Sequence, residues 1–232
     1  MSNYKKKYYK YKQKYLMMKY TNLNESSLKY NNELQDDYAK DCHQNNFNIK
    51  IIDDFLTAEE CEKIIELARP KLIPSEVIND KSISNDRTSS GVFINKDENI
   101  ILKKISQNVS KIVNIPIEDQ EDIQIINYQK GQFYNQHYDA CLDDDEGCKE
   151  DRKDGIRKNT FFIYLNDVKK GGYTGFPNLL RKIKPKQGRA IYWNNILPDE
   201  DFYKYDPCSL HIGIKPDEGE KWALTVWSRI KL

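Results

Sequence analysis

Long apolar runs, histidine and net charge are all scarce in this chain of 232 residues. No stretch approaches the about 18 consecutive apolar residues of a membrane-spanning helix, so we expect no transmembrane segment. Thirty-seven Lys and Arg against thirty-six Asp and Glu leave a net charge of +1. This balance argues against a basic nucleic-acid coat protein, and nucleic acid is not expected as a partner.

A classical secretion signal and a recognisable cysteine framework are missing as well. The first twenty residues hold seven Lys and six Tyr, where a signal peptide needs an apolar region of about 7–15 residues. No C-terminal retention signal is visible. Five cysteines are an odd number, and their spacing is not typical of a zinc or disulfide framework. We therefore expect reduced thiols and a cytosolic or virus-associated setting.

The composition divides the chain into two parts. Residues 1–46 are rich in Lys, Tyr and Asn and contain little that could form a core, which predicts a flexible or partly helical arm. The arm is either a solvated appendage, the simpler interpretation, or a tag for an anionic partner or a location. The third histidine, His43, lies in it and is taken as uninvolved. Residues 47–232 are expected to form the folded domain.

Helical patterns come first in this domain and strand patterns follow. Thr57 and Glu60 form a capping box before a helical apolar stripe that ends at Pro70, and a second stripe covers 101–112. Alternating or apolar segments then predict strands at 123–128, 160–165, 189–193, 210–214 and 222–227. This order indicates an α+β protein with a mainly β core, either a sandwich or a barrel.

Two of the three histidines lie in a pattern that suits a metal. His137 and Asp139 are two positions apart, so in an extended strand both side chains would project from one face. His211 lies on another predicted strand, 74 positions after His137. Two histidines and a carboxylate form the facial triad of non-haem Fe(II) oxygenases, which leaves coordination positions open. A bare His-x-Asp is weak evidence, and a surface pair would explain it equally well.

Lys221 strengthens the metal interpretation. It follows His211 by ten residues and shares strand parity with Thr225 and Trp227, so all three could face one pocket, whereas Trp222 belongs to the core. A lysine near a metal suits the far carboxylate of a dicarboxylic co-substrate. Alone, it could be a solvated surface residue.

Six blocks of the sequence together resemble the prolyl 4-hydroxylase branch of the Fe(II)/2-oxoglutarate dioxygenases. They cover 55–61, 87–91, 128–139, 164–166, 171–177, and 211–213 with 221–227. Any single block could arise by chance, but six in order, carrying the three candidate ligands and the lysine, are a specific signal. The resemblance extends from about residue 51 to residue 230. It implies a double-stranded β-helix, a cupin-like jelly roll with supporting N-terminal helices.

The resemblance also implies roles for individual residues. His137, Asp139 and His211 would bind Fe(II), and Lys221 would pair with 2-oxoglutarate. The other matched positions fall into two sets. Tyr128, Thr174 and Trp227 would line the co-substrate pocket, and Tyr134, Arg157, Arg87 and Ser89 would contact the peptide. Tyr128 and Tyr134 could instead be ordinary strand tyrosines, Thr174 a turn residue and Arg157 a surface charge.

The implied reaction is the hydroxylation of peptidyl proline to 4-hydroxyproline, with succinate and CO2 as the other products. O2 is a further co-substrate, and L-ascorbate keeps the iron reduced. Proline-rich peptides favour the extended polyproline II helix, which an aromatic groove can grip, and Tyr134, Tyr138 and Trp227 are candidate walls. Two alternatives stay open: the same chemistry on another protein residue or an alkylated base, and a non-catalytic binding module.

The sequence departs from the usual pattern of this family at two places. Residues 141–157 are unusually acidic, which predicts either a solvated loop or a mobile lid that favours basic peptides. Arg229 stands where some relatives carry a histidine that helps to bind peptide. Cys208 lies three residues before His211 and is expected to serve packing rather than the metal.

Overall fold

The computed structural model describes residues 47–75, 86–142, 146–197 and 204–231. The predicted arm at 1–46, with His43, lies outside the described residues. The helices are α3 (Ala58–Ala68), α4 (Ile100–Val113) and α5 (Glu146–Asp151), with 3-10 turns η2 (Arg69–Lys71), η3 (Ile117–Asp119), η4 (Arg152–Asp154), η5 (Pro177–Leu179) and η6 (Pro207–Ser209). Over the described ranges, none of the helices is long and apolar enough to cross a membrane.

The strands form two main antiparallel sheets. They are β1 (Lys50–Ile52), β2 (Ile73–Pro74), β3 (Ser90–Ile94), β4 (Ile123–Tyr128), β5 (Tyr134–His137), β6 (Ile156–Tyr164), β7 (Lys170–Gly171), β8 (Thr174–Phe176), β9 (Arg181–Ile183), β10 (Ala190–Asn194), β11 (His211–Gly213), β12 (Pro216–Glu218) and β13 (Lys221–Ile230). The large sheet has the order β1-β10-β6-β13-β4-β3-β2, and the small sheet has the order β5-β11-β8-β9. Strands β12 and β7 pair separately.

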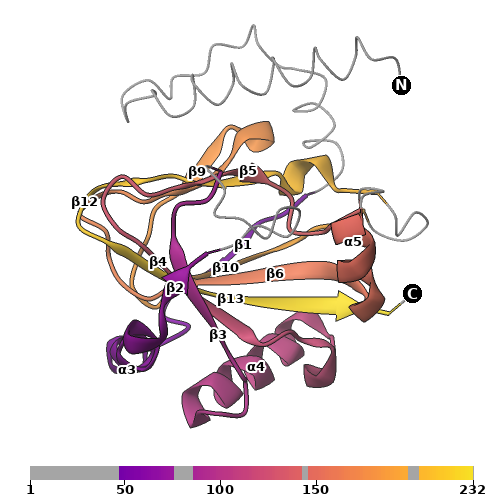
Figure 1. Ribbon diagram of the computed structural model, residues 1–232, viewed down its shortest axis with the longest axis horizontal. Helices are drawn as coiled ribbons and strands as arrows, with labels where there is room; N and C mark the ends of the chain where they lie inside the picture. The colour runs from indigo at the N-terminus through magenta and orange to yellow at the C-terminus, as the bar shows by residue number, and fades with distance from the viewer. Residues whose placement is uncertain (1–46, 76–85, 143–145, 198–203, 232) are drawn as a thin grey trace, which may run out of the picture.

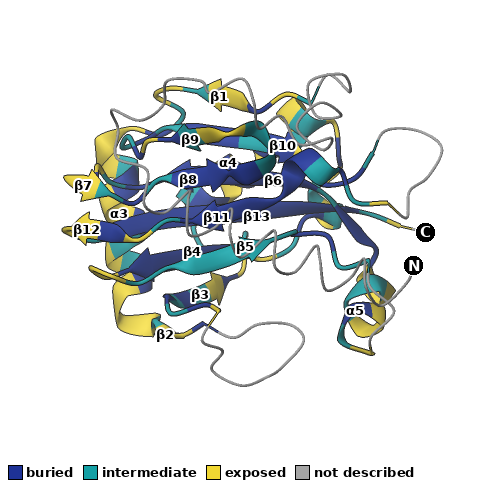
Figure 2. Ribbon diagram, turned by 90° about the horizontal axis from the view of Figure 1, so that it is seen from above, coloured by how far each residue is buried: buried dark blue, intermediate teal, exposed yellow. Residues whose placement is uncertain are grey.

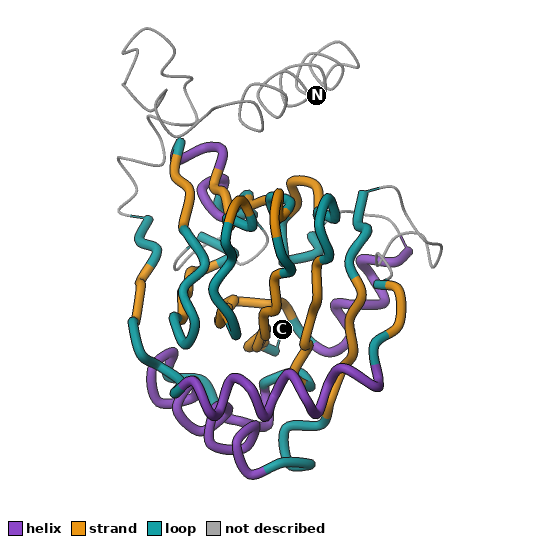
Figure 3. Tube along the Cα trace, turned by 90° about the vertical axis from the view of Figure 1, so that its left-hand side faces the viewer, coloured by secondary structure: helices purple, strands orange, loops and turns teal. Residues whose placement is uncertain are grey.

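The two sheets lie face to face, and α3 and α4 cover the outer face of the large sheet (Figures 1 and 3). The predicted jelly roll with supporting helices is therefore confirmed. Both sheets contribute strand ends to the space between them, and this is where the candidate site forms. Figure 2 shows that the central strands of both sheets are the most deeply buried part of the molecule.

Strict alternation on the central strands separates a core face from a pocket face. Trp222, Leu224 and Val226 of β13 point into the apolar core that the large sheet forms with α3 and α4, as predicted for Trp222. Their neighbours Lys221 and Thr225 line the cavity on the opposite face. On β6, Phe161 and Ile163 join the same core while Phe162 and Tyr164 belong to the inner cluster. A strand buried on both faces can therefore place core residues on one face and site residues on the other.

The helix signals in the sequence are confirmed at both ends. Thr57 and Glu60 form the predicted capping box, in which the Glu60 amide donates to Thr57 Oγ1 and Glu60 Oε2 accepts from the Thr57 amide. Helix α4 ends at Asn114, whose φ of 54° places it in the left-handed region that asparagine tolerates. Strand β1, which precedes α3, pairs with β10 over Lys50–Ile52.

The capping box predicts a measurable contribution to stability. Thr57→Ala removes the acceptor for the Glu60 amide and is expected to lower the free energy of unfolding by about 1 kcal/mol. Thr57→Ser keeps the hydroxyl and serves as the matched control. Urea denaturation of the three proteins measures the difference. Equal midpoints for Thr57→Ala and Thr57→Ser would show that the cap contributes nothing.

Candidate active site

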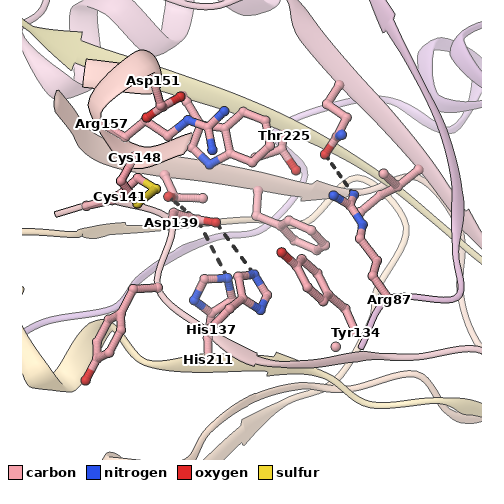
Figure 4. A pocket seen from close by; sticks show the side chains of 18 of the residues that line it. Arg87, Tyr134, His137, Asp139, Cys141, Cys148, Asp151, Arg157, His211 and Thr225 are labelled. Atoms are coloured by element: carbon pink, nitrogen blue, oxygen red, sulfur yellow. Dashed lines mark hydrogen bonds and ion pairs between the residues drawn. A yellow bond between two sulfur atoms is a disulfide. The ribbon is translucent and has the colours of Figure 1, made fainter. Parts of the chain in front are cut away.

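Strand pairing brings the two candidate histidines together. His137 is the last residue of β5 and His211 the first of β11, and they face each other in the antiparallel register. Their ring centroids are 4.1 Å apart. Asp139 lies just beyond the end of β5, so the expectation that it shares a strand with His137 was wrong. Its carboxylate nevertheless turns towards both rings, 3.6 Å from each Nε2 (Figure 4).

Hydrogen bonds fix the orientation of both imidazoles. His137 Nδ1 lies 2.7 Å from the Asn135 carbonyl oxygen, and His211 Nδ1 lies 2.9 Å from that of Ser209. A carbonyl oxygen can only accept, so each Nδ1 carries the proton and each Nε2 keeps its lone pair. The three ligand atoms lie within 4.8 Å of one another, a cluster that could hold a metal ion.

The charges of this cluster also suit a cation. Burial lowers the pKa of His137 to about 3, so its ring is neutral near pH 7. Burial alone would raise the pKa of Asp139, but the two histidines and the Thr160 hydroxyl outweigh it and hold that pKa at about 2. The cluster therefore presents two imidazole nitrogens and one ionised carboxylate, a donor set that suits a cation.

A buried lysine lies in the same cavity. Lys221 is 1% exposed and pairs in register with Tyr128 of β4. Its Nζ lies 3.5 Å from Thr174 Oγ1 and between 5.2 and 5.5 Å from the ring centroids of Tyr128, Phe162 and Tyr164. None of the carboxylates in the described residues pairs with it. Burial without a counter-charge lowers the pKa of Lys221 to about 7.

The cavity that contains these groups has a volume of about 760 Å³. Nearly all residues expected at the site line it: His137, Asp139, His211, Lys221, Tyr128, Thr174, Trp227, Tyr134, Arg157 and Arg87. Thr225 and Tyr138 line it too, as predicted, and Tyr138 stacks on Tyr205 at 4.5 Å. Ser89 is the exception, since it lies behind the cavity wall, 2% exposed, and accepts a hydrogen bond from Arg87 Nε.

Tyr134 is fixed between a cation and a candidate ligand. The Arg87 guanidinium lies 4.6 Å from the centre of its ring, and the His137 ring stacks on it at 3.6 Å with an interplanar angle of 18°. Arg87 is held in turn by Gln124, whose Oε1 accepts from Nη2 at 3.1 Å. Burial raises the pKa of Tyr134 to about 12, so the phenol stays neutral and can donate a hydrogen bond.

Arginine side chains and carboxylates close another part of the cavity wall. Glu121 accepts two hydrogen bonds from Arg157 at 2.5 and 2.7 Å, and one from Arg229 Nε at 2.7 Å. Arg157 also lies flat over Trp227, 3.9 Å from its ring. Arg229 also donates from Nη2 to Asp151 Oδ1 of α5 at 2.6 Å, and it does not line the cavity. Arg229 thus anchors α5 to the large sheet.

The expectation of reduced thiols was wrong. Cys141 and Cys148 form a disulfide with a Cα–Cα distance of 5.0 Å, and both line the cavity beside Asp139 (Figure 4). Cys208 is also disulfide-bonded, and Cys61 is the free cysteine of the described chain, buried in the core. No sequence pattern indicated this bond, because a spacing of seven residues matches no known framework and Cys148 lies within the short helix α5. The argument for a reducing compartment therefore loses its basis.

The acidic segment forms part of the wall. Within it, α5 and η4 contribute Glu150, Asp151 and Asp154 to the lining. Glu150 pairs with Lys153, and Glu146 pairs with Lys149. Two of its carboxylates are therefore paired within the segment, and a preference for basic peptides stays a prediction.

Two buried residues of β6 were missed at the site. Tyr164 Oη donates to Thr174 Oγ1 at 2.7 Å, and Thr160 Oγ1 donates to Asp139 Oδ2 at 2.5 Å. Tyr164 belongs to a quoted block, but no role was assigned to it. The signal was present in the alternation of β6, where positions 160, 162 and 164 share the pocket face. The continuous apolar run at 161–165 hid that alternation.

Comparisons with known proteins agree with this geometry. Residues 123–229 match the family described as the 2OG-Fe(II) oxygenase superfamily. The chain is 35% identical over 182 residues to a protein of Acanthamoeba polyphaga mimivirus named "Putative prolyl 4-hydroxylase", covering 77% of this chain and 73% of that relative. It is 35% identical over 199 residues to prolyl 4-hydroxylase 5 of Arabidopsis thaliana, covering 76% of this chain and 66% of the other.

Solved structures give the same result. The viral collagen prolyl hydroxylase of Paramecium Bursaria Chlorella virus-1, solved as a complex with 2OG, superposes with a TM-score of 0.63 at 31% identity. The match covers 78% of this chain and 95% of that structure. The fold therefore has a counterpart in a protein solved as a complex with 2OG.

The shared carboxylate of Glu121 predicts a strong effect on stability. Glu121→Gln leaves two arginines, whose side chains are only 10% and 9% exposed, without that counter-charge. We expect a loss of about 3 kcal/mol in the free energy of unfolding. Glu98→Gln is the control, because Glu98 and its partner Lys71 are 46% and 42% exposed and such pairs contribute less than about 1 kcal/mol. Similar losses in the two variants would contradict this reading of the network.

Proposed function

The chain belongs to the 2OG-Fe(II) oxygenase superfamily, in its prolyl 4-hydroxylase-like branch, and we propose that it hydroxylates proline residues in peptides with Fe(II), 2-oxoglutarate and O2. The observation that carries this proposal is the combination of charges in one cavity. One carboxylate and two imidazoles can bind a cation, and a buried ammonium group without a counter-charge can bind an anion. A metal with a dicarboxylate co-substrate satisfies both.

His137, Asp139 and His211 would hold the iron. Two imidazole nitrogens with free lone pairs and one ionised carboxylate match the donor set of non-haem Fe(II) oxygenases. When bound together, Fe(II), 2-oxoglutarate and O2 supply the oxidising power that converts a C–H bond of proline to C–OH, with succinate and CO2 as the other products. L-ascorbate would serve as reductant, as the family resemblance implies.

Lys221 would bind the far carboxylate of 2-oxoglutarate. Its ammonium is buried, lies next to the Thr174 hydroxyl and has aromatic rings around it. An anion placed there replaces the counter-charge that the protein does not provide, and the water-excluding surroundings strengthen the attraction. Tyr128 would complete the polar lining of this end of the cavity, Tyr164 would hold the Thr174 hydroxyl in place, and Trp227 would form a wall.

The remaining lining residues would receive the peptide. Tyr134, Tyr138 and Trp227 offer aromatic surface, and Arg87 and Arg157 offer guanidinium groups beside it. Aromatic faces suit the rings of a polyproline II segment, and guanidinium groups suit its carbonyl oxygens. Ser89 would act through Arg87 and Tyr128, since it does not line the cavity itself.

Turnover of 2-oxoglutarate tests the proposal. The protein is incubated with Fe(II), ascorbate and either polyproline or a peptide with Pro-Ala or Ser-Pro repeats, and both succinate and hydroxyproline are measured. We expect peptide-dependent succinate together with hydroxyproline. His137→Ala should reduce the rate by at least about 1000-fold because the iron loses a ligand. His43→Ala, at the histidine that the sequence predicts to be uninvolved, should leave it unchanged.

The possible contrary results differ in meaning. Succinate without hydroxyproline would keep the oxygenase chemistry and remove proline as the target. An iron-loaded protein that makes no succinate with or without peptide would overturn the proposed reaction.

The low pKa of Lys221 predicts uptake of a proton when 2-oxoglutarate binds. In the free protein this pKa is about 7, so at about pH 8 most of the amines are neutral, and the bound carboxylate must raise the pKa to hold the ammonium form. Affinity should therefore fall as the pH rises above 7. Calorimetry of 2-oxoglutarate binding to Mn(II)-loaded protein, in buffers of different ionisation enthalpy, measures the uptake.

Lys221→Met provides the control for this measurement. The variant keeps an apolar stem of similar length but has no titratable group, so binding should be weaker and independent of the buffer. A wild-type protein that takes up no proton at about pH 8 would contradict the low pKa of Lys221, and equal affinity in Lys221→Met would contradict its assignment as the anion-binding group.

A further inference from the structure

A buried hydroxyl and a buried amide stand behind the carboxylate of the candidate metal centre. Thr160, on β6, is 1% exposed, and Asn195, which follows β10, is 0% exposed. Thr160 Oγ1 lies 2.5 Å from Asp139 Oδ2. Asn195 Nδ2 lies 2.9 Å from Thr160 Oγ1. Neither residue belongs to the set that the sequence patterns identified.

The direction of these hydrogen bonds follows from counting protons. Thr160 has one hydroxyl proton and two acceptors within reach, Asp139 Oδ2 at 2.5 Å and Asn195 Oδ1 at 3.1 Å. The ionised carboxylate is both closer and the stronger acceptor, so the proton points to Asp139. The Thr160 oxygen is then free to accept from the Asn195 amide. Nδ2 of that amide also donates to the Arg157 carbonyl, which can only accept and so fixes the orientation of the amide.

Asn195 itself is held by backbone contacts that extend to a second candidate ligand. Its amide N–H donates to the Lys158 carbonyl at 2.8 Å, and its carbonyl accepts from the Asp206 amide at 3.0 Å. The Asp206 carbonyl accepts from the Ser209 amide at 2.9 Å, and the Ser209 carbonyl accepts from His211 Nδ1. Backbone hydrogen bonds therefore hold Asn195 in place behind Thr160. The same series of hydrogen bonds includes Ser209, whose carbonyl orients His211.

We propose that Thr160, supported by Asn195, is a positioning residue for the metal centre. The hydroxyl engages Oδ2 of Asp139 and leaves Oδ1 as the oxygen without a hydrogen-bond donor among the described residues, so the carboxylate is oriented before a metal arrives. Partners of this kind commonly change metal affinity by about 10–100-fold when they are lost. The inference rests on the proposed function in that it requires a metal at His137, Asp139 and His211.

Metal affinity provides a test that does not depend on turnover. Mn(II) is titrated into the full-length protein without 2-oxoglutarate, and the free ion is followed by its EPR signal. Thr160→Ser and Thr160→Ala form the matched pair, because both lack the methyl group and they differ only in the hydroxyl. We expect Thr160→Ala to bind Mn(II) at least about 10-fold more weakly than Thr160→Ser. Thermal unfolding of the metal-free proteins identifies any variant that has lost its fold.

Ser228→Ala controls for the loss of a buried hydroxyl as such. Ser228 lies on β13 beside β6, is 1% exposed, and its Oγ has no hydrogen-bond partner in the part of the chain that the structure describes. This variant should bind Mn(II) like the wild type. Equal affinities for folded Thr160→Ser and Thr160→Ala would overturn the inference about Thr160 alone. A wild-type protein that binds no Mn(II) would overturn the metal centre, and this inference with it.

Discussion

The antiparallel pairing of β5 with β11 is the contact on which the site depends. It places His137 opposite His211 although 74 positions separate them in the sequence. The backbone hydrogen bonds of the two short strands thus set the distance between the imidazoles, and a carbonyl two residues before each histidine sets its tautomer. Loops hold side chains less precisely than paired strands do, so placing both histidines on strands restricts how far the imidazoles can move relative to each other.

The interior of the cavity keeps its opposite charges apart. Lys221 and Asp139 are both buried in it, yet neither neutralises the other, and each is instead surrounded by groups that orient it. Unpaired buried charges reduce stability, so the fold must compensate elsewhere. The core between the large sheet and helices α3 and α4, together with the paired arginines around Glu121, provides that compensation. The result is a stable frame around a site that is complete only with its ligands.

The sequence predicted the features that follow a period or a motif. Strand parity placed Lys221 and Thr225 on the pocket face and Trp222 in the core, and the capping box placed the start of α3. Contacts that depend on sheet register were out of reach, because no local pattern shows that β6 lies beside β10 and brings Thr160 to Asn195. The disulfide between Cys141 and Cys148 was missed for a similar reason, since it depends on how α5, which carries Cys148, is placed against Cys141.

The alternation along β13 limits how this enzyme can change in evolution. Substitutions on either face alter one contact, but an insertion or deletion of a single residue between Lys221 and Trp227 would exchange the two faces of the strand beyond it. Core aromatic and aliphatic groups would then enter the cavity, while the residues that line it would enter the apolar core. We therefore expect the number of residues between these two positions to stay constant among relatives, even where the core side chains of the strand differ.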